Sequence, residues 1–141
     1  MTVRTERTFE FEVPPERVWA FIADPTKRAE AISVAESWEQ EGEETIWHIR
    51  LPIPVIDRTV AVRTRDVERV ENERVRFVGR SRVMTVEGTH ELAAVDGGTR
   101  LTNRFVVDGK LPGVERFFRK NLDAELDNLE DALRRDIAGT A

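Results

Sequence analysis

Residues 112–139, PGVERFFRKNLDAELDNLEDALRRDIAG, decide the fold of this chain. After Pro112-Gly113 the segment continues without proline or glycine as far as Gly139, a residue typical of the position just after a helix. Apolar residues recur every three or four positions and form one stripe: Val114, Phe118, Leu122, Leu126, Leu129, Leu133 and Ile137. The pattern predicts a long amphipathic helix from Val114 to about Ile137, whose apolar stripe must be buried against another layer.

The segment before this helix supplies that layer. From Ser33 to about Asp108 the residues alternate and turn in the manner of strands. Sequential strands joined by short turns form an antiparallel sheet, and the helix has nothing else to pack against. Further towards the N-terminus, Thr5 to Val13 shows the period-two alternation of a half-buried strand.

Two short helices are predicted between that first strand and the sheet. Pro14-Pro15-Glu16 opens the first helix, since proline suits the first turn. Asp24-Pro25 ends it, because a residue before proline avoids helical geometry, and Thr26 to Ile32 forms the second. The predicted order is one strand, two short helices, about six strands and a long helix, in one α+β domain over residues 1–141.

Glycine-containing turns predict two of the strand registers. A two-residue turn at Glu41-Gly42 pairs Trp38 with Thr45 and leaves one apolar face. That face carries Val34, Trp38, Trp47 and Ile49. A two-residue turn at Gly97-Gly98 pairs Ala94 with Leu101, Leu92 with Asn103, and His90 with Phe105, and sets Glu91 opposite Arg104.

The hairpin that begins at Arg58 to Val70 has two possible registers. A two-residue loop at Asn72-Glu73 would place arginine opposite arginine, which charge repulsion disfavours. A three-residue loop instead pairs Glu68 with Arg76, and a bulge is a further possibility. Whether Arg63, Arg65, Arg80 and Arg82 face inward or outward stays open. Pro52 and Pro54 are expected to break the chain just before this hairpin.

Composition excludes many chemistries. The 141 residues include no cysteine and only two histidines, which excludes thiol nucleophiles, cysteine-based zinc sites and multi-histidine metal centres. We therefore expect no metal and no cofactor. The net charge of −5 argues against nucleic acid as a partner. The sequence has no apolar run long enough for a transmembrane segment and no signal-peptide pattern after Met1, so we expect a cytoplasmic protein.

Three stretches resemble the START-like, or SRPBCC, superfamily, which includes polyketide cyclases, the birch pollen allergen and an accessory protein of carbon monoxide dehydrogenase. They are Val13 to Pro25, Gly97 to Thr102, and Gly109 to Gly113 with the long helix that follows. The resemblance implies the helix-grip fold, in which a seven-stranded antiparallel sheet wraps around the C-terminal helix and encloses a ligand cavity. Small residues on the sheet, Gly79, Gly88 and Ala94, are expected to enlarge this space.

Side chains on the inner face of the sheet and on the helix stripe are the candidate ligand-binding residues. They are Trp38, Trp47, Ile49, Phe77, Met84, Val86, His90, Leu92, Asn103, Phe105, Phe118, Leu122 and Glu125. Most are apolar and serve equally well as ordinary core. Phe9, Trp19 and Phe21 are expected in the core rather than at the cavity.

Two candidates carry reactive groups. His90 is either a half-buried histidine packed on Phe105 or a hydrogen-bonding group or general base in the cavity. Glu125 lies within the apolar stripe of the helix, where a carboxylate is costly to bury alone. It is expected either to pair with an inward arginine such as Arg63 or Arg65, or to contact a ligand.

The leading hypothesis is binding or transport of a small hydrophobic ligand: a lipid, an isoprenoid, or an aromatic or polyketide-like compound. His90, Asn103 and Glu125 would orient it. A second hypothesis is a cyclase or dehydratase of the same fold using His90 or Glu125 as acid or base. A third, implied by the resemblance to the carbon monoxide dehydrogenase accessory protein, is recruitment of a partner through an apolar patch around Leu111-Pro112 and Phe117. The absence of any evident catalytic constellation favours binding over catalysis, and the oligomeric state stays open.

Overall fold

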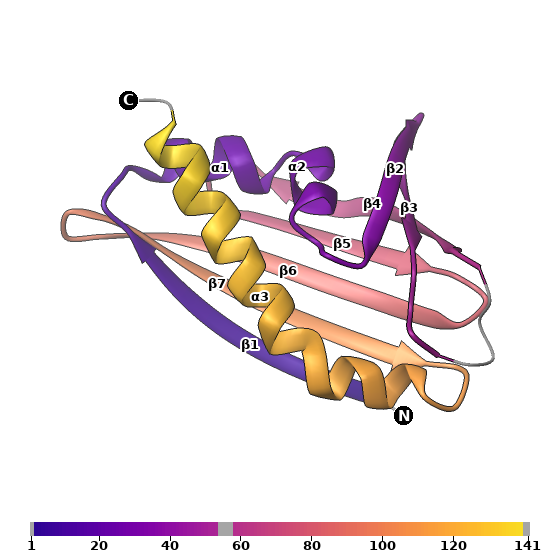
Figure 1. The fold of residues 1–141 in the computed structure, drawn as a ribbon. Helices are drawn as coiled ribbons and strands as arrows, with labels where there is room; N and C mark the ends of the chain where they lie inside the picture. The colour runs from indigo at the N-terminus through magenta and orange to yellow at the C-terminus, as the bar shows by residue number, and fades with distance from the viewer. Residues whose placement is uncertain (1, 54–57, 140–141) are drawn as a thin grey trace.

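A curved seven-stranded antiparallel sheet wraps around a long C-terminal helix in the computed structural model, which describes residues 2–53 and 58–139 (Figure 1). The elements are β1 (Thr2–Phe11), α1 (Pro15–Ile22), α2 (Pro25–Glu30), β2 (Ala35–Glu41), β3 (Glu44–Ile49), β4 (Val60–Val70), β5 (Arg74–Arg80), β6 (Met84–Val95), β7 (Gly98–Gly109) and α3 (Val114–Ala138). The strand order is β1-β7-β6-β5-β4-β3-β2, so the first strand pairs with the last. The predicted helix-grip fold is confirmed. The expected break at Pro54 lies outside the described residues.

Helix α3 covers the concave face of the sheet, as its apolar stripe predicts (Figure 1). The stripe residues from Val114 to Leu133 are buried, and Gly139 follows the last turn. None of the helices within residues 2–53 and 58–139 is long and apolar enough to cross a membrane.

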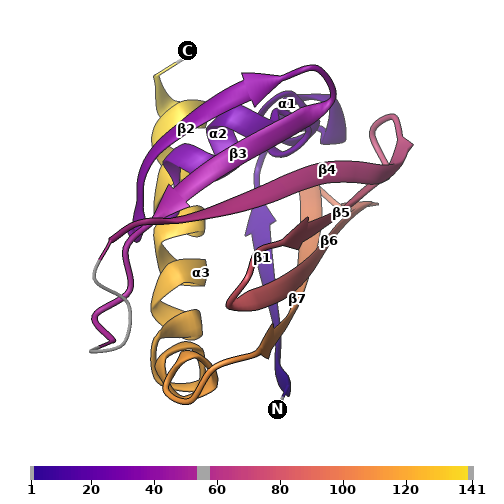
Figure 2. The same ribbon diagram turned by 90° about the vertical axis from the view of Figure 1, so that its right-hand side faces the viewer.

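The two short helices cover one end of the concave face, and Figure 2 shows β2 and β3 crossing beside them. Proline begins each helix, because its fixed φ suits the first turn. Asp24 caps α2 by accepting hydrogen bonds from the backbone N–H of Thr26 at 2.9 Å and from its hydroxyl at 2.7 Å. Burial opposes the charge on Asp24, but these hydrogen bonds prevail and hold the pKa of that carboxyl below its usual value.

The two glycine turns lie one residue away from their predicted positions. The first loop is Gly42-Glu43, and Trp38 pairs with Trp47 rather than Thr45. The second loop is Asp96-Gly97, and His90 pairs with Asn103 rather than Phe105. Moving a turn by one residue moves the pairing by two, so every side chain keeps its predicted face.

The third hairpin combines a three-residue loop with a bulge. The loop lies between Val70 and Arg74, and Glu68 pairs with Arg76, which removes one arginine pair of the two-residue register. Beyond the bulge, Arg63 still lies opposite Arg80. Because of the bulge between Asp66 and Glu68, Asp66 follows Val62 and Thr64 on the inner face while Glu68 lies on the outer face with Arg76. The four arginines whose facing the sequence leaves open, Arg63, Arg65, Arg80 and Arg82, are all exposed.

The interior contains two apolar clusters along α3. One surrounds Phe77, Trp47 and Phe118, and the other contains Phe9, Phe21 and Leu101, with Trp19 half-buried against it. The small residues expected to open space do not do so. The ring of Phe77 occupies the place where a Cβ on Gly88 would lie, Val86 fills the place beside Gly79, and Ala94 is exposed.

Candidate ligand-binding cavity

A cavity lies between the inner face of the sheet and α3, beside α2. The centre of a water-sized sphere can occupy about 70 Å³ of this space. That is several times the room that one water needs. The residues that line it are Arg28, Ala31, Ile32, Val34, Trp47, Ile49, Phe77, Met84, Val86, His90, Phe105, Val107, Phe118, Leu122, Glu125, Leu126 and Leu129. Nearly all are apolar, so the cavity is suited to a compact hydrophobic molecule.

Most of the predicted site residues line this cavity, and three do not. Trp38 is half-buried at the edge of the first cluster. Leu92 belongs to the second cluster, near α1. Asn103 is fully buried and bonds to His90, but it does not itself line the cavity. Strand alternation places these residues on the inner face correctly, but it cannot tell where along the strand the cavity begins.

Phe77 is the centre of the aromatic wall. Its ring stacks on His90 at 6.1 Å between centroids and meets Trp47 edge-on at 5.7 Å and Phe105 at 6.0 Å. The guanidinium of Arg28 lies 5.2 Å from the centroid of the same ring. These contacts help to fix the positions of His90 and Arg28 at the cavity wall.

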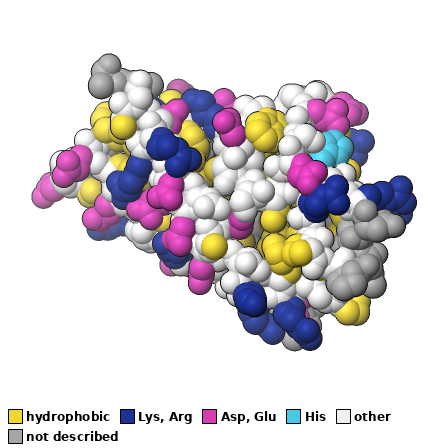
Figure 3. Space-filling view, viewed as in Figure 1, with side chains coloured by type: hydrophobic (Ala, Val, Ile, Leu, Met, Phe, Trp, Pro, Cys, Tyr) yellow, Lys and Arg dark blue, Asp and Glu magenta, His cyan; other side chains and the backbone are white. Residues whose placement is uncertain are grey.

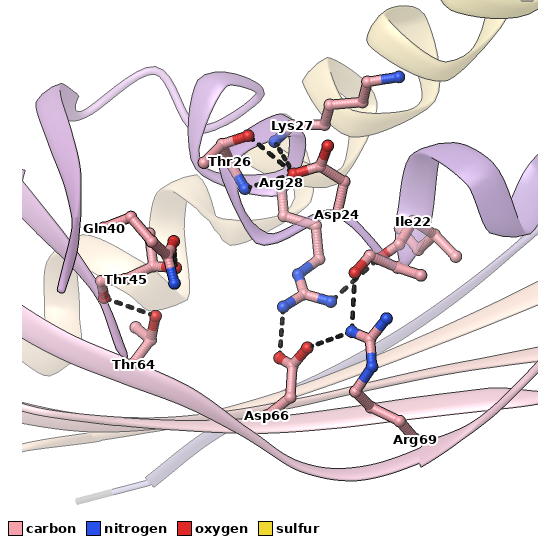
Figure 4. Close-up of polar contacts among 11 residues, drawn as sticks. Ile22, Asp24, Thr26, Lys27, Arg28, Gln40, Thr45, Thr64, Asp66 and Arg69 are labelled. Atoms are coloured by element: carbon pink, nitrogen blue, oxygen red, sulfur yellow. Dashed lines mark hydrogen bonds and ion pairs between the residues drawn. The ribbon is translucent and has the colours of Figure 1, made fainter. Parts of the chain in front are cut away.

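Arg28 lines the cavity although the sequence does not predict it there, and it is only 5% exposed. Figure 4 shows how it is held: one nitrogen donates to the Asp66 carboxylate at 2.5 Å and another to the backbone oxygen of Ile22 at 2.9 Å. Arg69 binds the other Asp66 oxygen at 2.6 Å. Burial lowers the pKa of Arg28 from its usual value, and Asp66 counteracts this effect. The signal is available in β4, where alternation from buried Val62 and Thr64 places Asp66 on the inner face.

His90 is buried, 1% exposed, and has one bonded ring nitrogen. Its Nδ1 lies 2.7 Å from Asn103 Oδ1, while Asn103 Nδ2 donates to the backbone oxygen of Arg7 at 3.2 Å. That second bond directs the amide oxygen towards the histidine, so Nδ1 carries the proton and Nε2 has a free lone pair. Burial, with a smaller contribution from the charge of Arg28, lowers the pKa of His90 to about 3. The ring is therefore neutral at physiological pH.

Three buried polar atoms on cavity-lining residues have no hydrogen-bond partner among the described residues. They are Arg28 Nε, Trp47 Nε1 and His90 Nε2. The first two are donors and the third is an acceptor. Because an unpaired buried polar atom is costly, such atoms at a cavity mark the places where a ligand or a water binds.

Glu125 lies beside the cavity and bonds across its edge. Its carboxylate accepts from the backbone N–H of Ser33 at 2.9 Å and from the Ser33 hydroxyl, joining α3 to the segment between α2 and β2. The expected salt bridge to Arg63 or Arg65 is wrong, because both arginines are on the outer face of the sheet. Glu125 does line the cavity, and the ligand contact that the sequence offers as the alternative stays a prediction.

Two other polar side chains of the β2–β3 hairpin region lie on the surface. His48 contacts Glu39 at 2.8 Å and Glu36 accepts from Arg50 at 2.6 Å, both at exposed positions. Leu111 is 38% exposed and Phe117 half-buried. Figure 3 shows hydrophobic side chains grouped between α3 and the β2–β3 side of the molecule, with basic groups below them.

The match to known proteins covers most of the chain. The family model described as polyketide cyclase / dehydrase and lipid transport matches residues 2–134. Among curated proteins, no sequence matches this chain.

Similar solved structures share the fold at low sequence identity. A conserved protein from Geobacillus kaustophilus has a TM-score of 0.78 at 17% identity, covering 98% of this chain and 97% of that chain. A START superfamily protein from Mycobacterium smegmatis has a TM-score of 0.75 at 13% identity, covering 98% and 99%. A protein from Thermus thermophilus has a TM-score of 0.68 at 22% identity, covering 100% of both chains.

Proposed function

The chain belongs to the polyketide cyclase / dehydrase and lipid transport family, and from this premise we propose that it binds a small hydrophobic molecule between its sheet and α3. The superfamily resemblance seen in the sequence is confirmed. The observation that carries the proposal is the cavity itself, whose lining is nearly all apolar and which has unpartnered polar atoms along its wall.

Burial of apolar surface supplies the affinity. At about 25 cal/mol per Å², a ligand the size of one aromatic side chain, which buries roughly 200 Å², gains about 5 kcal/mol before the costs of association. The space of about 70 Å³ is smaller than the roughly 150 Å³ of an engineered cavity that binds benzene, so its walls must move apart to admit a ligand. A compact ring compound requires less of this movement than a long acyl chain. An isoprenoid or aromatic compound is therefore favoured over an extended lipid.

Ligand capture with a blocking variant tests the proposal. Protein purified under native conditions is analysed by native mass spectrometry, and bound molecules are extracted and identified. Ala31 lines the cavity, so Ala31→Phe should fill it and abolish co-purification. Ala124 is exposed on α3, so Ala124→Phe is the matched control and should retain the ligand. Equal retention by the two variants, or no apolar ligand in any preparation, would overturn the proposal.

A cyclase or dehydratase activity in the same cavity is the second candidate, and the free lone pair of His90 Nε2 favours it. The lowered pKa argues against it, because a nitrogen with a pKa of about 3 is a weak base at neutral pH. Binding is therefore the stronger proposal. Liquid chromatography with mass spectrometry of the captured ligand, before and after incubation with fresh protein, distinguishes the two. Dehydration lowers the mass of the ligand by one water, and cyclisation changes its chromatographic retention time.

A further inference from the structure

We infer that the ligand is a neutral compound bearing a hydroxyl group, and that this hydroxyl donates its hydrogen to His90 Nε2. The inference rests on the proposed function and specifies what the same cavity selects. Its basis is a mismatch in the cavity wall, which is apolar and yet contains a buried ring nitrogen without a partner among the described residues.

His90 can only accept at this site. Its Nδ1–H is used by Asn103, whose own amide N–H is bound to the backbone of Arg7. The Asn103 amide therefore cannot reverse without losing that bond, and the histidine cannot exchange its tautomer without losing the other. A ligand group opposite Nε2 must bring a hydrogen, which a hydroxyl does and an ether, a ketone or a carboxylate does not.

The charges around the cavity favour a neutral molecule. Arg28 is the charged group beside His90, and its guanidinium is bonded to the Asp66 carboxylate, which Arg69 shares. The charge of Asp24 also acts on Arg28, so the two arginines and the two aspartates together bring no net charge. The carboxylate of Glu125, at the edge of the cavity, would repel an anion. An ionised ligand would lose its hydration here without gaining an unpaired counter-charge.

The other two unpartnered atoms extend this selectivity. Trp47 Nε1 and Arg28 Nε are donors, so they suit oxygen atoms of the ligand rather than further hydroxyl hydrogens. A hydroxyl at His90 together with an oxygen acceptor elsewhere on the ring system would satisfy both kinds of contact.

Three compounds of one scaffold test the inference: 4-isopropylphenol, its isostere 4-isopropyltoluene, and 4-isopropylanisole, which has the oxygen but no hydrogen to donate. Isothermal titration calorimetry gives the affinity of each for the unmodified protein and for His90→Phe, which keeps a ring but removes Nε2. The preference for the phenol over its isostere should fall about 10-fold or more in the variant. The anisole should follow the isostere. Comparing ratios cancels differences in ligand hydration.

A measurement on the unmodified protein covers the case in which His90→Phe does not fold. In the ¹⁵N NMR spectrum of the histidine rings, the Nε2 resonance of His90 should move towards the hydrogen-bonded position with the phenol and not with the isostere. Ala124→Phe, on the exposed side of α3, should leave that movement intact.

The outcomes separate the two proposals. If the isostere binds but the phenol ratio does not change and Nε2 does not move, a water satisfies Nε2, and the hydroxyl inference is wrong while the proposed function stands. Tighter binding of 4-isopropylbenzoate than of the phenol would overturn the neutral-ligand part. If none of these compounds binds and no ligand co-purifies, the proposed function fails and the inference fails with it.

Discussion

Arg28 brings a positive charge into the interior at the junction of α2 and the sheet. Its partner Asp66 has a side chain only 10% exposed, so removal of that carboxylate leaves an uncompensated buried charge. Asp66→Ala should lower the free energy of unfolding by about 3 kcal/mol, measured by urea denaturation. Glu10→Ala breaks the exposed pair with Arg100 and should cost less than about 1 kcal/mol. Equal losses in the two variants would show that burial does not strengthen the dependence of Arg28 on its partner.

His90 makes stability depend on pH in a definite window. The unfolded chain takes up a proton near pH 6.5, whereas the folded protein resists it until about pH 3. The unfolded state thus binds more protons between these values, and the folded state loses stability as pH falls through them. From pH 7.5 to pH 5 the loss attributable to this residue should be about 2 kcal/mol.

Denaturation of two variants isolates that contribution, since the chain has two histidines. His48→Gln changes an exposed ring and should keep the pH dependence of the unmodified protein. His90→Phe should lose about 2 kcal/mol of it. The same slope in both variants would show that His90 is not buried in its neutral form.

For single residues, the sequence identifies which side chains are chemically notable but not which of them form hydrogen bonds or ion pairs with one another. His90 and Asn103 are both predicted on the inner face, and their direct pairing depends on a turn position that glycine alone does not determine. Arg28 escapes prediction because an arginine in a short helix is ordinarily solvated, and its buried partner Asp66 lies in a different element.

Among the elements, β6 approaches β5 closely at Gly88. A Cβ there would lie 2.2 Å from Cε1 of Phe77, so the ring must move towards the cavity. Gly88→Ala should destabilise the protein by about 2 kcal/mol and weaken ligand binding. Gly42→Ala is the control, because that turn has φ of +63° but open space around it. It should cost about 1 kcal/mol through backbone strain alone and leave binding unchanged. Denaturation and calorimetry measure both effects, and unchanged binding in Gly88→Ala would contradict the predicted displacement of Phe77.

The contact between α3 and the segment after α2 should control how fast the cavity exchanges its ligand. Glu125→Ala removes both hydrogen bonds to Ser33. Dissociation of 4-isopropylphenol, followed by stopped-flow tryptophan fluorescence, should accelerate roughly 3- to 10-fold, with stability changed by less than about 1 kcal/mol. Glu130→Ala removes a carboxylate that pairs with Arg134 on the solvent side of α3 and should leave the rate unchanged. A rate equal to that of the unmodified protein in Glu125→Ala would show that ligand enters elsewhere.

The order of the elements and the faces of the strands are more predictable than the boundaries. The first strand, predicted from Thr5 to Val13, is Thr2–Phe11, and the second helix, predicted from Thr26 to Ile32, is Pro25–Glu30. The long helix begins at the predicted residue because glycine precedes it and the apolar stripe starts there. The strands keep their predicted faces because alternation has a period of two. Each turn differs by one residue from its prediction because residues 41–43 and residues 96–98 both offer adjacent loops of equal length. Cross-strand packing of Trp38 on Trp47 and bonding of His90 to Asn103 select between them.

For the whole molecule, the outer face of the sheet is an array of exposed ion pairs. They include Arg104 with Glu6 and Glu91, Arg100 with Glu10, Arg76 with Glu87, and Arg63 with Glu44. Exposed pairs contribute little, and salt also screens the repulsion that accompanies a net charge of −5. The free energy of unfolding should therefore differ by less than about 1.5 kcal/mol between about 0.05 and 1 M NaCl in urea titrations. A loss of more than about 3 kcal/mol would show that the array stabilises the fold as a network.

The cavity as a whole is only partly predictable. A curved sheet over one amphipathic helix implies an enclosed space, and the side chains facing it follow from periodicity. Its small size does not, because it depends on how Phe77 fills the hollow over Gly88. That is a matter of side-chain packing in three dimensions, which no spacing along the chain reveals.

The pairing of the first strand with the last has a consequence for synthesis on the ribosome. Residues 2–11 pair with residues 99–108, so at about 5–20 residues per second the early strand waits roughly 5–20 s for its neighbour to be made. During that delay Phe9 and Phe11 have no sheet to cover them. The glutamates at positions 6, 10 and 12, which later lie outside, give the nascent segment a charged face that discourages pairing with other chains.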